Sequence, residues 1–268
     1  MISKNLLKYI HSLEQKKGRR KEGLFVAEGP KVVGELIKGA TPTRLIATAE
    51  WWASAPIAQR SQDCVVNDDE LRKASFVQHP QQVIALFPIP QPDINIQSLA
   101  DNLTIVLDGV QDPGNLGTII RIADWFGIST IICSHDSADA YNPKVVQASM
   151  GSIARVEVVY KDLEQLFASL PPEIPVFGTF LDGSNIYAQE LTPSGIIVMG
   201  NEGNGISPQV ARHINRRLLI PAFPGDKETA ESLNVAIATA ITCAEFRRRY
   251  IFSNSVQMRC TGNPITLK

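Results

Sequence analysis

The sequence predicts an α/β protein of two units, a small N-terminal αβ unit and a larger C-terminal unit built on a parallel sheet. Three observations lead to this fold class. A length of 268 residues suits two modest domains better than one. Short apolar segments alternate with helical patterns along most of the chain, which is typical of a parallel sheet covered by helices. A proline-rich segment at Pro88, Pro90 and Pro92 interrupts this alternation once.

The composition is that of an ordinary globular protein, with 44% hydrophobic and 20% charged residues. The chain has no run of about 18 uncharged apolar residues, so we expect neither a signal sequence nor a membrane span. Its four cysteines, Cys64, Cys133, Cys243 and Cys260, occur singly and without a C-x-x-C pair. This spacing indicates neither a disulfide framework nor a metal site, and we expect a cytoplasmic protein without a metal.

The N-terminal unit, residues 1–90, alternates short helices with short strands. Gly29-Pro30 separates a strand from a helix, and Asp68 opens a later helix. The expected helices cover residues 5–15, 30–39, 53–60 and a segment from residue 68, and the expected strands cover residues 24–27, 44–47, 64–66 and 83–87. The alternating prolines that follow favour an extended linker, which we place at residues 91–101.

The C-terminal unit, residues 102–252, repeats a strand and helix pattern that predicts a two-faced parallel sheet. The expected strands cover residues 103–107, 130–133, 155–159, 176–180, 196–199 and 218–220. A last helix, at about residues 233–250, ends in Arg247-Arg248-Arg249, and cationic side chains suit a helix C-terminus. Beyond it the periodicity is lost, and we expect a flexible tail at residues 253–268.

Charge is unevenly distributed along the chain. The formal net charge is −1, yet residues 1–44 contain ten Lys or Arg against four Asp or Glu. Within this stretch, Lys16, Lys17, Arg19, Arg20 and Lys21 form a short basic loop. Such a loop can follow a phosphate backbone through charge alone, so these residues are candidate RNA contacts. A solvated helix end explains the same residues about equally well.

The first of three polar constellations runs from Asp108 to Gly117, where a strand ends in a glycine-rich turn and a helix follows at residues 118–126. Such a turn presents backbone N–H groups to a ligand. Asn115 and Arg121 project near the same sheet edge. Arg121 lies among isoleucines, and a buried guanidinium needs acceptors. It therefore pairs either with an acidic side chain or with an RNA phosphate.

The second constellation, Gly200-Asn201-Glu202-Gly203, follows another apolar strand, and a helix begins at Ser207 or Pro208. Ligands of open α/β sheets bind beyond the carboxyl ends of the strands, where both glycine-rich loops are expected. Two such turns on one sheet build a crevice. Glu202 either braces the loop as an acceptor or takes part in catalysis.

The third constellation runs through Gly225 and a polar stretch to Ser232-Leu233-Asn234. Ser232 suits the position before a helix, where its hydroxyl would cap the backbone. A purely structural role is less plausible for Asn234 than for Ser232, because asparagine is a poor helix former. A polar contact at the crevice is the better interpretation.

Other enzyme classes match this sequence less well. The glycine spacing fits neither the dinucleotide fingerprint nor the P-loop, although a doubly wound enzyme with a nucleotide ligand remains an alternative. His135 and His213 stand alone in the C-terminal unit, so neither a catalytic triad nor a metal centre is indicated.

Taken in order, the three constellations closely resemble the motifs of the SpoU (TrmH) family of RNA 2′-O-ribose methyltransferases, which belong to the SPOUT class. The match covers about residues 103–250 and is carried by Asn115 with Arg121, by the Gly200 to Gly203 turn and by Ser232-Leu233-Asn234. Residues 1–90 resemble, less closely, the small αβ RNA-binding domain that precedes the catalytic domain in many members. The segment Leu24 to Gly29 matches the opening strand of that domain.

The resemblance implies a SPOUT fold with a deep trefoil knot, a homodimer, and S-adenosylmethionine as the cofactor. The implied cofactor-binding residues are Thr179, Gly200, Asn201, Glu202, Gly203, Ile220, Phe223 and Leu233. The implied catalytic residues are Asn115, Arg121, Glu202, Ser232 and Asn234. Arg121 would bind the nucleotide phosphate and so join the basic loop in holding RNA, while Glu202 would brace the loop.

Two departures from the family pattern concern loops. Gly225 and Ser232 are separated by six residues, where the family has a bulge of about three, and a typical Pro-Gln-Gly is here Pro80-Gln81-Gln82. The expected function is methylation of a ribose 2′-hydroxyl in structured RNA, with 23S rRNA preferred over tRNA as the substrate. The remaining alternative is an RNA-binding protein that keeps the fold without catalysis.

Overall fold

The computed structural model describes residues 2–92, 94–223 and 230–253, so the expected tail lies almost wholly outside the described residues. The N-terminal residues form a four-stranded sheet of order β1-β4-β2-β3. Its strands are β1 (Leu24–Glu28), β2 (Arg44–Thr48), β3 (Cys64–Val66) and β4 (Val83–Pro88). β4 pairs antiparallel with β1 and β2, and β2 pairs parallel with β3.

Five helices accompany this sheet: α1 (Lys4–Ser12), α2 (Lys16–Glu22), α3 (Pro30–Ile37), α4 (Ala49–Ala53) and α5 (Asp68–Ala74). The basic segment is therefore a helix of its own, α2, and not a loop. The helix expected at residues 53–60 is wrong. The Thr48 hydroxyl caps an earlier helix by accepting from the Trp51 N–H, and Pro56 disfavours helical backbone just before it.

The C-terminal residues form a six-stranded sheet of order β10-β8-β9-β5-β6-β7, in which neighbouring strands are all parallel. Its strands are β5 (Leu103–Asp108), β6 (Thr130–Cys133), β7 (Glu157–Tyr160), β8 (Val176–Asn185), β9 (Gly195–Gly200) and β10 (Arg216–Leu219). The predicted parallel α/β sheet is thus confirmed. Every residue of β5 is buried, as expected of a central strand covered on both faces.

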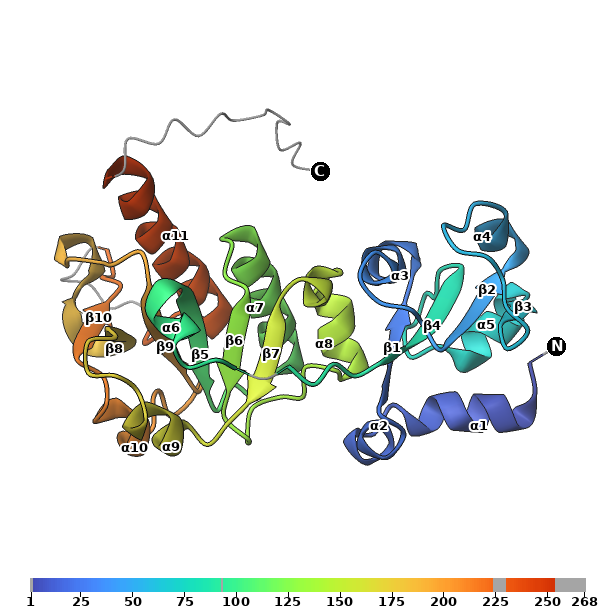
Figure 1. Ribbon diagram of the computed structural model, residues 1–268, viewed down its shortest axis with the longest axis horizontal. Coiled ribbons are helices and arrows are strands. Elements are labelled where there is room, and N and C mark those ends of the chain that lie inside the picture. Colours follow the sequence, from blue (N-terminus) through green and yellow to red (C-terminus); the bar gives the residue numbers. More distant parts are fainter. Residues whose placement is uncertain (1, 93, 224–229, 254–268) are drawn as a thin grey trace.

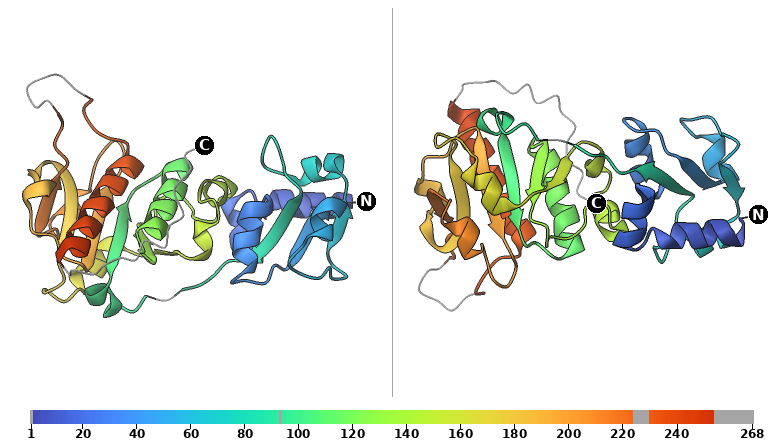
Figure 2. Two further views of the ribbon diagram at one scale, coloured as in Figure 1. Left: turned by 90° about the horizontal axis from the view of Figure 1, so that it is seen from above. Right: turned by 60° about the horizontal axis from the view of Figure 1, so that its bottom comes forward.

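Helices cover both faces of this sheet (Figures 1 and 2). One face packs against α7 (Pro113–Trp125), α8 (Pro143–Ala148) and α11 (Val235–Ser253). The other packs against α6 (Ser98–Asp101), α9 (Leu163–Ala168) and α10 (Pro208–Ala211). Two short 3₁₀ helices, η1 (Ser152–Ala154) and η2 (Ile186–Ala188), complete the fold. No helix of the described ranges is long and apolar enough to span a membrane.

Helix α7 begins at Pro113, five residues before the expected start. The Asp112 carboxylate accepts from the Asn115 N–H at 2.7 Å, and proline suits the first turn because its missing N–H would have no partner there. Asn115 and Arg121 consequently belong to one helix. The start of α7 lies at the carboxyl end of β5, so Asn115 faces the edge of the sheet where ligands bind.

The two units contact each other through polar and aromatic side chains. Arg19 of α2 pairs with Asp139, Arg155 pairs with Glu35 of α3, and the Phe25 ring lies 4.9 Å from the Tyr141 ring between centroids. A buried ion pair and an aromatic contact resist sliding, because their geometry is specific. These contacts hold α2 and α3 against the C-terminal unit.

Candidate functional site

Two loops meet at the carboxyl edge of the C-terminal sheet, because β5 and β9 are direct neighbours there. The Asp108 carboxylate accepts from the Ser207 N–H at 2.7 Å, and the Asn201 amide donates to the Gly109 carbonyl at 2.7 Å. The Asn201 side-chain oxygen also accepts from the N–H groups of Gly203 and Asn204. Asn201 therefore shapes its own turn and ties it to the loop after β5.

Gly200 is required by the close return of this turn. Asn201 and Gly205 form an isolated β-bridge, which brings the backbone of Gly205 over Gly200. A Cβ atom at Gly200 would lie 2.2 Å from the Gly205 carbonyl carbon. No side chain fits at that distance, so the turn can close only on a glycine.

A chain of side-chain hydrogen bonds joins the three sequence constellations. The Asn234 amide donates to the Asn115 oxygen at 2.9 Å, and the Asn115 amide donates to the Glu202 carboxylate at 2.9 Å. The first bond connects residues 119 positions apart and the second connects residues 87 positions apart. The fold thus brings Asn115, Glu202 and Asn234 together in one polar cluster.

Asn234 also begins α11, a role that we expected of Ser232. The Asn234 side-chain oxygen accepts from the N–H groups of Ala236 and Ile237, at 3.0 and 3.3 Å. One end of this amide caps the helix while the other end contacts Asn115. Ser232 is exposed and lies before this cap, so its expected capping role is wrong.

Arg121 does not lie in the apolar interior that its isoleucine neighbours suggested. It projects from the exposed side of α7, because the buried stripe of that helix is formed by its neighbours Ile119, Ile120 and Ala123. Within the described ranges its guanidinium has no ion-pair or hydrogen-bond partner. An internal acidic partner is therefore excluded for the described residues, and the guanidinium is available to an external acceptor.

A cavity of about 580 Å³ opens beside the polar cluster, between the middle of β8, the ends of β9 and β10 and the start of α11. It is lined by residues from the expected cofactor set: Thr179, Gly200, Asn201, Glu202, Gly203, Ile220 and Leu233. Ser232 also lines it. Phe223 does not, and with 95% of its surface exposed it lies away from the cavity wall, which corrects its expected place.

Sequence reasoning missed several apolar residues of this cavity. Met199 and Leu219 line it at the carboxyl ends of β9 and β10, and Phe180 lines it from the middle of β8. The Arg217 guanidinium stacks on the Phe180 ring at 3.5 Å from its centroid and fixes its position. For Met199 and Leu219 the position at a strand end was a usable signal, since the residues that finish parallel strands face the ligand edge.

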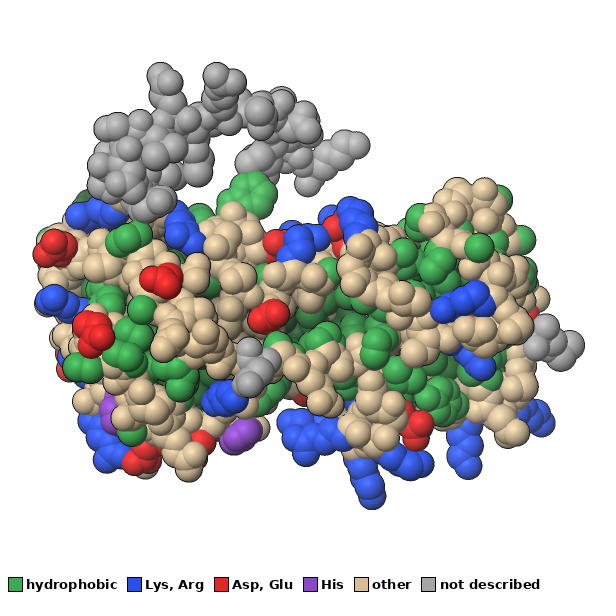
Figure 3. Space-filling model, in the orientation of Figure 1, with side chains coloured by type: hydrophobic (Ala, Val, Ile, Leu, Met, Phe, Trp, Pro, Cys, Tyr) green, Lys and Arg blue, Asp and Glu red, His purple; other side chains and the backbone are tan. Residues whose placement is uncertain are grey.

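The basic residues of α2 divide into two groups. Lys17, Arg20 and Lys21 are exposed and Lys16 is half-buried, and Figure 3 shows Lys and Arg side chains gathered along the lower edge of the molecule, where α2 lies in Figure 1. Arg19 is instead 2% exposed, because Asp139 and the carbonyls of Leu13 and Glu14 surround its guanidinium. Its expected contact with RNA phosphate is therefore wrong.

Comparisons with known proteins assign both parts of the chain. Residues 102–244 match the model of the SpoU rRNA Methylase family, and residues 4–85 match the MRM3-like substrate binding domain. The chain is 30% identical over 239 residues to the 23S rRNA (guanosine(2553)-2′-O)-methyltransferase RlmP of Bacillus subtilis, covering 88% of this chain and 93% of that protein.

Solved structures show the same similarity. A Porphyromonas gingivalis protein, described as an RNA methyltransferase of the TrmH family, is 42% identical with a TM-score of 0.83, over 93% of this chain and 99% of that one. The AdoMet-bound rRNA methyltransferase of Sinorhizobium meliloti is 29% identical with a TM-score of 0.79, over 93% and 96% of the two chains.

Proposed function

Because the chain belongs to the SpoU rRNA methylase family, we propose that it transfers the methyl group of S-adenosylmethionine to a ribose 2′-hydroxyl of 23S rRNA. The observation that carries this proposal is the hydrogen-bonded cluster of Asn234, Asn115 and Glu202 beside a ligand-sized cavity. Polar side chains converging next to a cavity that also has apolar lining are typical of a catalytic site.

The cavity suits S-adenosylmethionine in size and in lining. A volume of about 580 Å³ lies within the range of small-molecule sites. The side chains of Phe180 and Leu219 offer apolar surface for an adenine ring, and the backbone groups of Thr179, Gly200, Ile220 and Leu233 would supply hydrogen bonds. When bound, the cofactor supplies an electrophilic methyl group on a sulfonium.

A ribose hydroxyl is a weak nucleophile, so the protein must orient it and stabilise the charge that grows on its oxygen. Methyl transfer would form a C–O bond in place of the C–S bond, and the hydroxyl proton would pass to solvent water. We assign the developing charge and the neighbouring phosphate to Arg121, whose guanidinium offers five N–H donors. Asn115 would orient the ribose, held in place by Glu202 and Asn234.

We further propose that the protein acts as a homodimer with a trefoil-knotted catalytic fold, in the cytoplasm. The dimer is supported by apolar side chains that α7 and α11 expose, since Trp125 is 71% and Ile237 is 51% exposed. α7 and α11 pack against each other over the same face of the sheet, so Trp125 and Ile237 are exposed on the same side of the C-terminal unit. Large exposed apolar side chains on neighbouring elements are typical of protein interfaces.

RNA would be held in part by the exposed cations of α2, namely Lys17, Arg20 and Lys21. Lys16 lies 5.8 Å from the centroid of the Tyr160 ring at the end of β7, so this helix borders the carboxyl edge of the catalytic sheet. Phosphate contacts release counterions, and binding should therefore weaken steeply as salt rises. An RNA affinity that is equal at low and physiological salt would remove α2 from the interface.

Methyl transfer can be measured with tritiated S-adenosylmethionine and two RNA substrates, transcribed 23S rRNA and bulk tRNA. We expect label in 23S rRNA, a loss of at least about 100-fold for Arg121→Ala, and an unchanged rate for the control Arg212→Ala, whose exposed side chain pairs with Glu164. Cofactor affinity of Arg121→Ala should stay within a few fold. Label confined to tRNA would change the substrate, and no label with intact cofactor binding would refute catalysis.

A further inference from the structure

One wall of the cavity that we assign to the cofactor is a part of β8 that leaves the regular ladder. Arg217 of β10 pairs with Gly178, and the next residue, Leu218, pairs with Ser184. The segment Thr179 to Gly183 is therefore inserted between two consecutive pairs, and we refer to it as the β8 bulge. Within the described ranges, β9 pairs with β8 only as far as Gly178. The ladders on the two sides of β8 thus do not determine the shape of this bulge.

The β8 bulge supplies apolar lining to the cavity. Thr179, Phe180 and Leu181 all line it. Leu181 is 74% exposed and the Phe180 ring is half-buried, so both side chains offer apolar surface to a ligand. Bulges often lie next to active sites, where they change the direction of a side chain. The conformation of the β8 bulge therefore decides the shape of this wall.

Both ends of the β8 bulge are glycines at which no side chain fits. A Cβ at Gly183 would lie 2.5 Å from the Leu218 carbonyl carbon, because the bulge returns directly onto the backbone of β10. A Cβ at Gly178 would lie 2.9 Å from the Phe180 Cε2, because the ring folds back over this glycine. These close approaches fix the ends of the bulge. Its middle, from Phe180 to Asp182, needs other contacts.

The Arg217 side chain contacts the middle of the β8 bulge at two residues. The centre of its guanidinium lies 3.5 Å from the centroid of the Phe180 ring, and its Nη2 donates to the Asp182 Oδ1 at 2.5 Å. A planar guanidinium can stack on a ring and donate to a carboxylate at once, which an ammonium group cannot do. The backbone of Arg217 is itself fixed, because it pairs with Gly178 just before the register shifts. Arg217 therefore ties the middle of the bulge to the ladder.

These contacts are too exposed to serve mainly the stability of the fold. The side chains of Arg217 and Asp182 are 42% and 76% exposed. Exposed ion pairs and exposed cation–π contacts contribute little to the free energy of unfolding. They can still order the side chains that line a cavity. A ligand that enters a wall already ordered loses less conformational entropy on binding, and its affinity rises accordingly.

We propose that Arg217 is a positioning residue for the cofactor, which holds the β8 bulge in its ligand-binding shape through Phe180 and Asp182. This inference rests on the proposed function, because that function assigns the cavity to S-adenosylmethionine. It concerns the binding step and no bond of methyl transfer. An RNA phosphate is the competing ligand for an exposed arginine. β10 is, however, the edge strand at the end of the sheet remote from the N-terminal unit and from the cations of α2 (Figure 1).

Isothermal titration calorimetry with S-adenosylmethionine and with its demethylated product, without RNA, measures the positioning role. Arg217→Ala should raise the Kd for both ligands about tenfold, because two lining side chains lose their fixed positions. The Tm of the free protein should stay within about 2 °C of the wild type. An unchanged Kd in this variant would overturn the proposal, and so would a fall in Tm large enough to show that the variant is partly unfolded.

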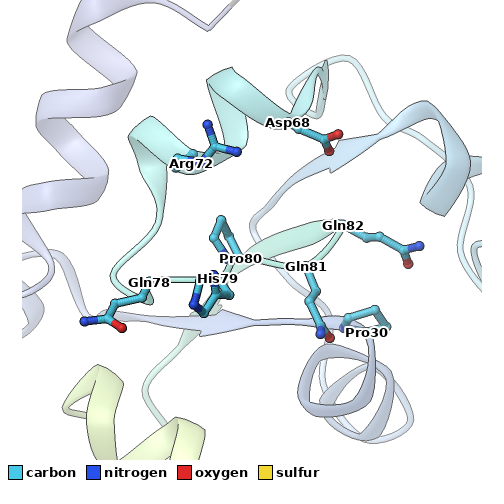
Figure 4. A pocket seen from close by; sticks show the side chains of 8 residues that line it. All are labelled: Pro30, Asp68, Arg72, Gln78, His79, Pro80, Gln81 and Gln82. Atoms are coloured by element: carbon cyan, nitrogen blue, oxygen red, sulfur yellow. The ribbon is translucent and has the colours of Figure 1, made fainter.

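Two arginines serve as matched controls in this titration. Arg216→Ala removes the neighbouring exposed cation of the same strand. Arg72→Ala removes an exposed arginine that also pairs with a carboxylate, that of Asp69 at 2.9 Å, but lies beside a separate cavity in the N-terminal unit (Figure 4). Both controls should bind the two ligands with the Kd of the wild type. A weaker affinity in either control, equal to that of Arg217→Ala, would show a general effect of charge and overturn the proposal.

Further variants separate the two contacts of Arg217. Arg217→Lys keeps the charge but loses the planar stack, so it should recover only part of the lost affinity. Asp182→Asn keeps the stack and weakens the ion pair, so it should raise the Kd about threefold or less. Adding Arg217→Ala to Phe180→Ala should weaken binding less than Arg217→Ala does alone, because the arginine acts in part through the ring. Fully additive effects would contradict that route.

Methyl transfer to 23S rRNA distinguishes this inference from the proposed function. Arg217→Ala should raise the KM for S-adenosylmethionine, while kcat at saturating cofactor and the KM for RNA stay unchanged. A raised KM for RNA with an unaltered Kd for the cofactor would assign Arg217 to the RNA and overturn the positioning role. A wild type whose cofactor binding depends on Arg217 but which transfers no methyl group would refute the catalytic function alone.

Discussion

Replacing Arg19 by alanine should detach α2 from the C-terminal unit. The Arg19 guanidinium donates to Asp139 at 2.5 and 3.2 Å, to the Leu13 carbonyl at 2.8 Å and to the Glu14 carbonyl at 2.6 Å. It is therefore the central donor of a small buried network. Arg19→Ala would leave one carboxylate and two carbonyls without these bonds and would open a cavity between the two units.

The expected loss of stability follows from the burial of the ion pair between Arg19 and Asp139. Removing one partner of a buried ion pair typically destabilises a protein by about 3–5 kcal/mol. The Asp139 side chain is 17% exposed, so water can partly solvate the carboxylate that remains, and we expect the lower end of that range, about 3 kcal/mol. For a chain of this size the loss corresponds to a fall in Tm of about 6–12 °C.

Differential scanning calorimetry measures this directly, with Arg20→Ala as the matched control on the same helix. Arg20 is exposed, so its removal should change Tm by less than about 2 °C. Methyl transfer by Arg19→Ala should weaken mainly through a higher KM for RNA, because the exposed cations of α2 lose their fixed position. If Arg19→Ala melts within about 2 °C of the wild type, the ion pair does not hold the two units together.

Two further predictions concern packing and pH. Gly117→Ala would place a Cβ 2.4 Å from the Ala148 Cβ, and it should lower the unfolding free energy by about 1–3 kcal/mol in urea titrations. Gly34→Ala meets no atom within 4 Å, and it should raise the unfolding free energy by about 0.5–1 kcal/mol. Equal effects of the two variants would contradict the close packing of α7 on α8 at Gly117. Burial raises the pKa of the Glu28 carboxyl above its ordinary 4.5, although hydrogen bonds from Ser75 and Phe76 oppose this shift. The folded state therefore holds the carboxyl proton more tightly than the unfolded state does. The unfolding free energy should fall as pH rises through the raised pKa. Glu28→Gln should remove that fall and be at least as stable as the wild type at pH 7, and a destabilised variant at that pH would refute the assignment.

Much of the architecture follows from local patterns in the sequence. Strands such as β5 and β9 are recognisable because each is a short, continuous apolar run that ends in a glycine-rich turn. Once neighbouring parallel strands are expected, their following loops must share an edge, so Asn115 and Glu202 could be placed on the same side of the sheet. Helix boundaries were less predictable, because Asp112 and Asn234 cap helices through side chains whose partners depend on loop conformation.

The contacts between distant segments could not be predicted in this way. Residues 119 positions apart meet in the bond between Asn234 and Asn115, and no periodicity encodes that distance. Only the structure likewise shows that Gln82, in place of the glycine of the typical Pro-Gln-Gly, adopts a left-handed φ of +54°.

Arg19 and Arg121 show the difference between what the sequence predicts and what only the folded structure determines. Their residue type and neighbours indicated an exposed Arg19 in a basic run and a buried Arg121 among isoleucines, and the fold reverses both. Apolar periodicity and turn residues are local properties, so the sequence specified the parallel sheet and the edge at which its loops gather. Burial is a property of what packs against a side chain from elsewhere, so the folded chain assigned Arg19 to the joint between the units and left Arg121 free for a ligand.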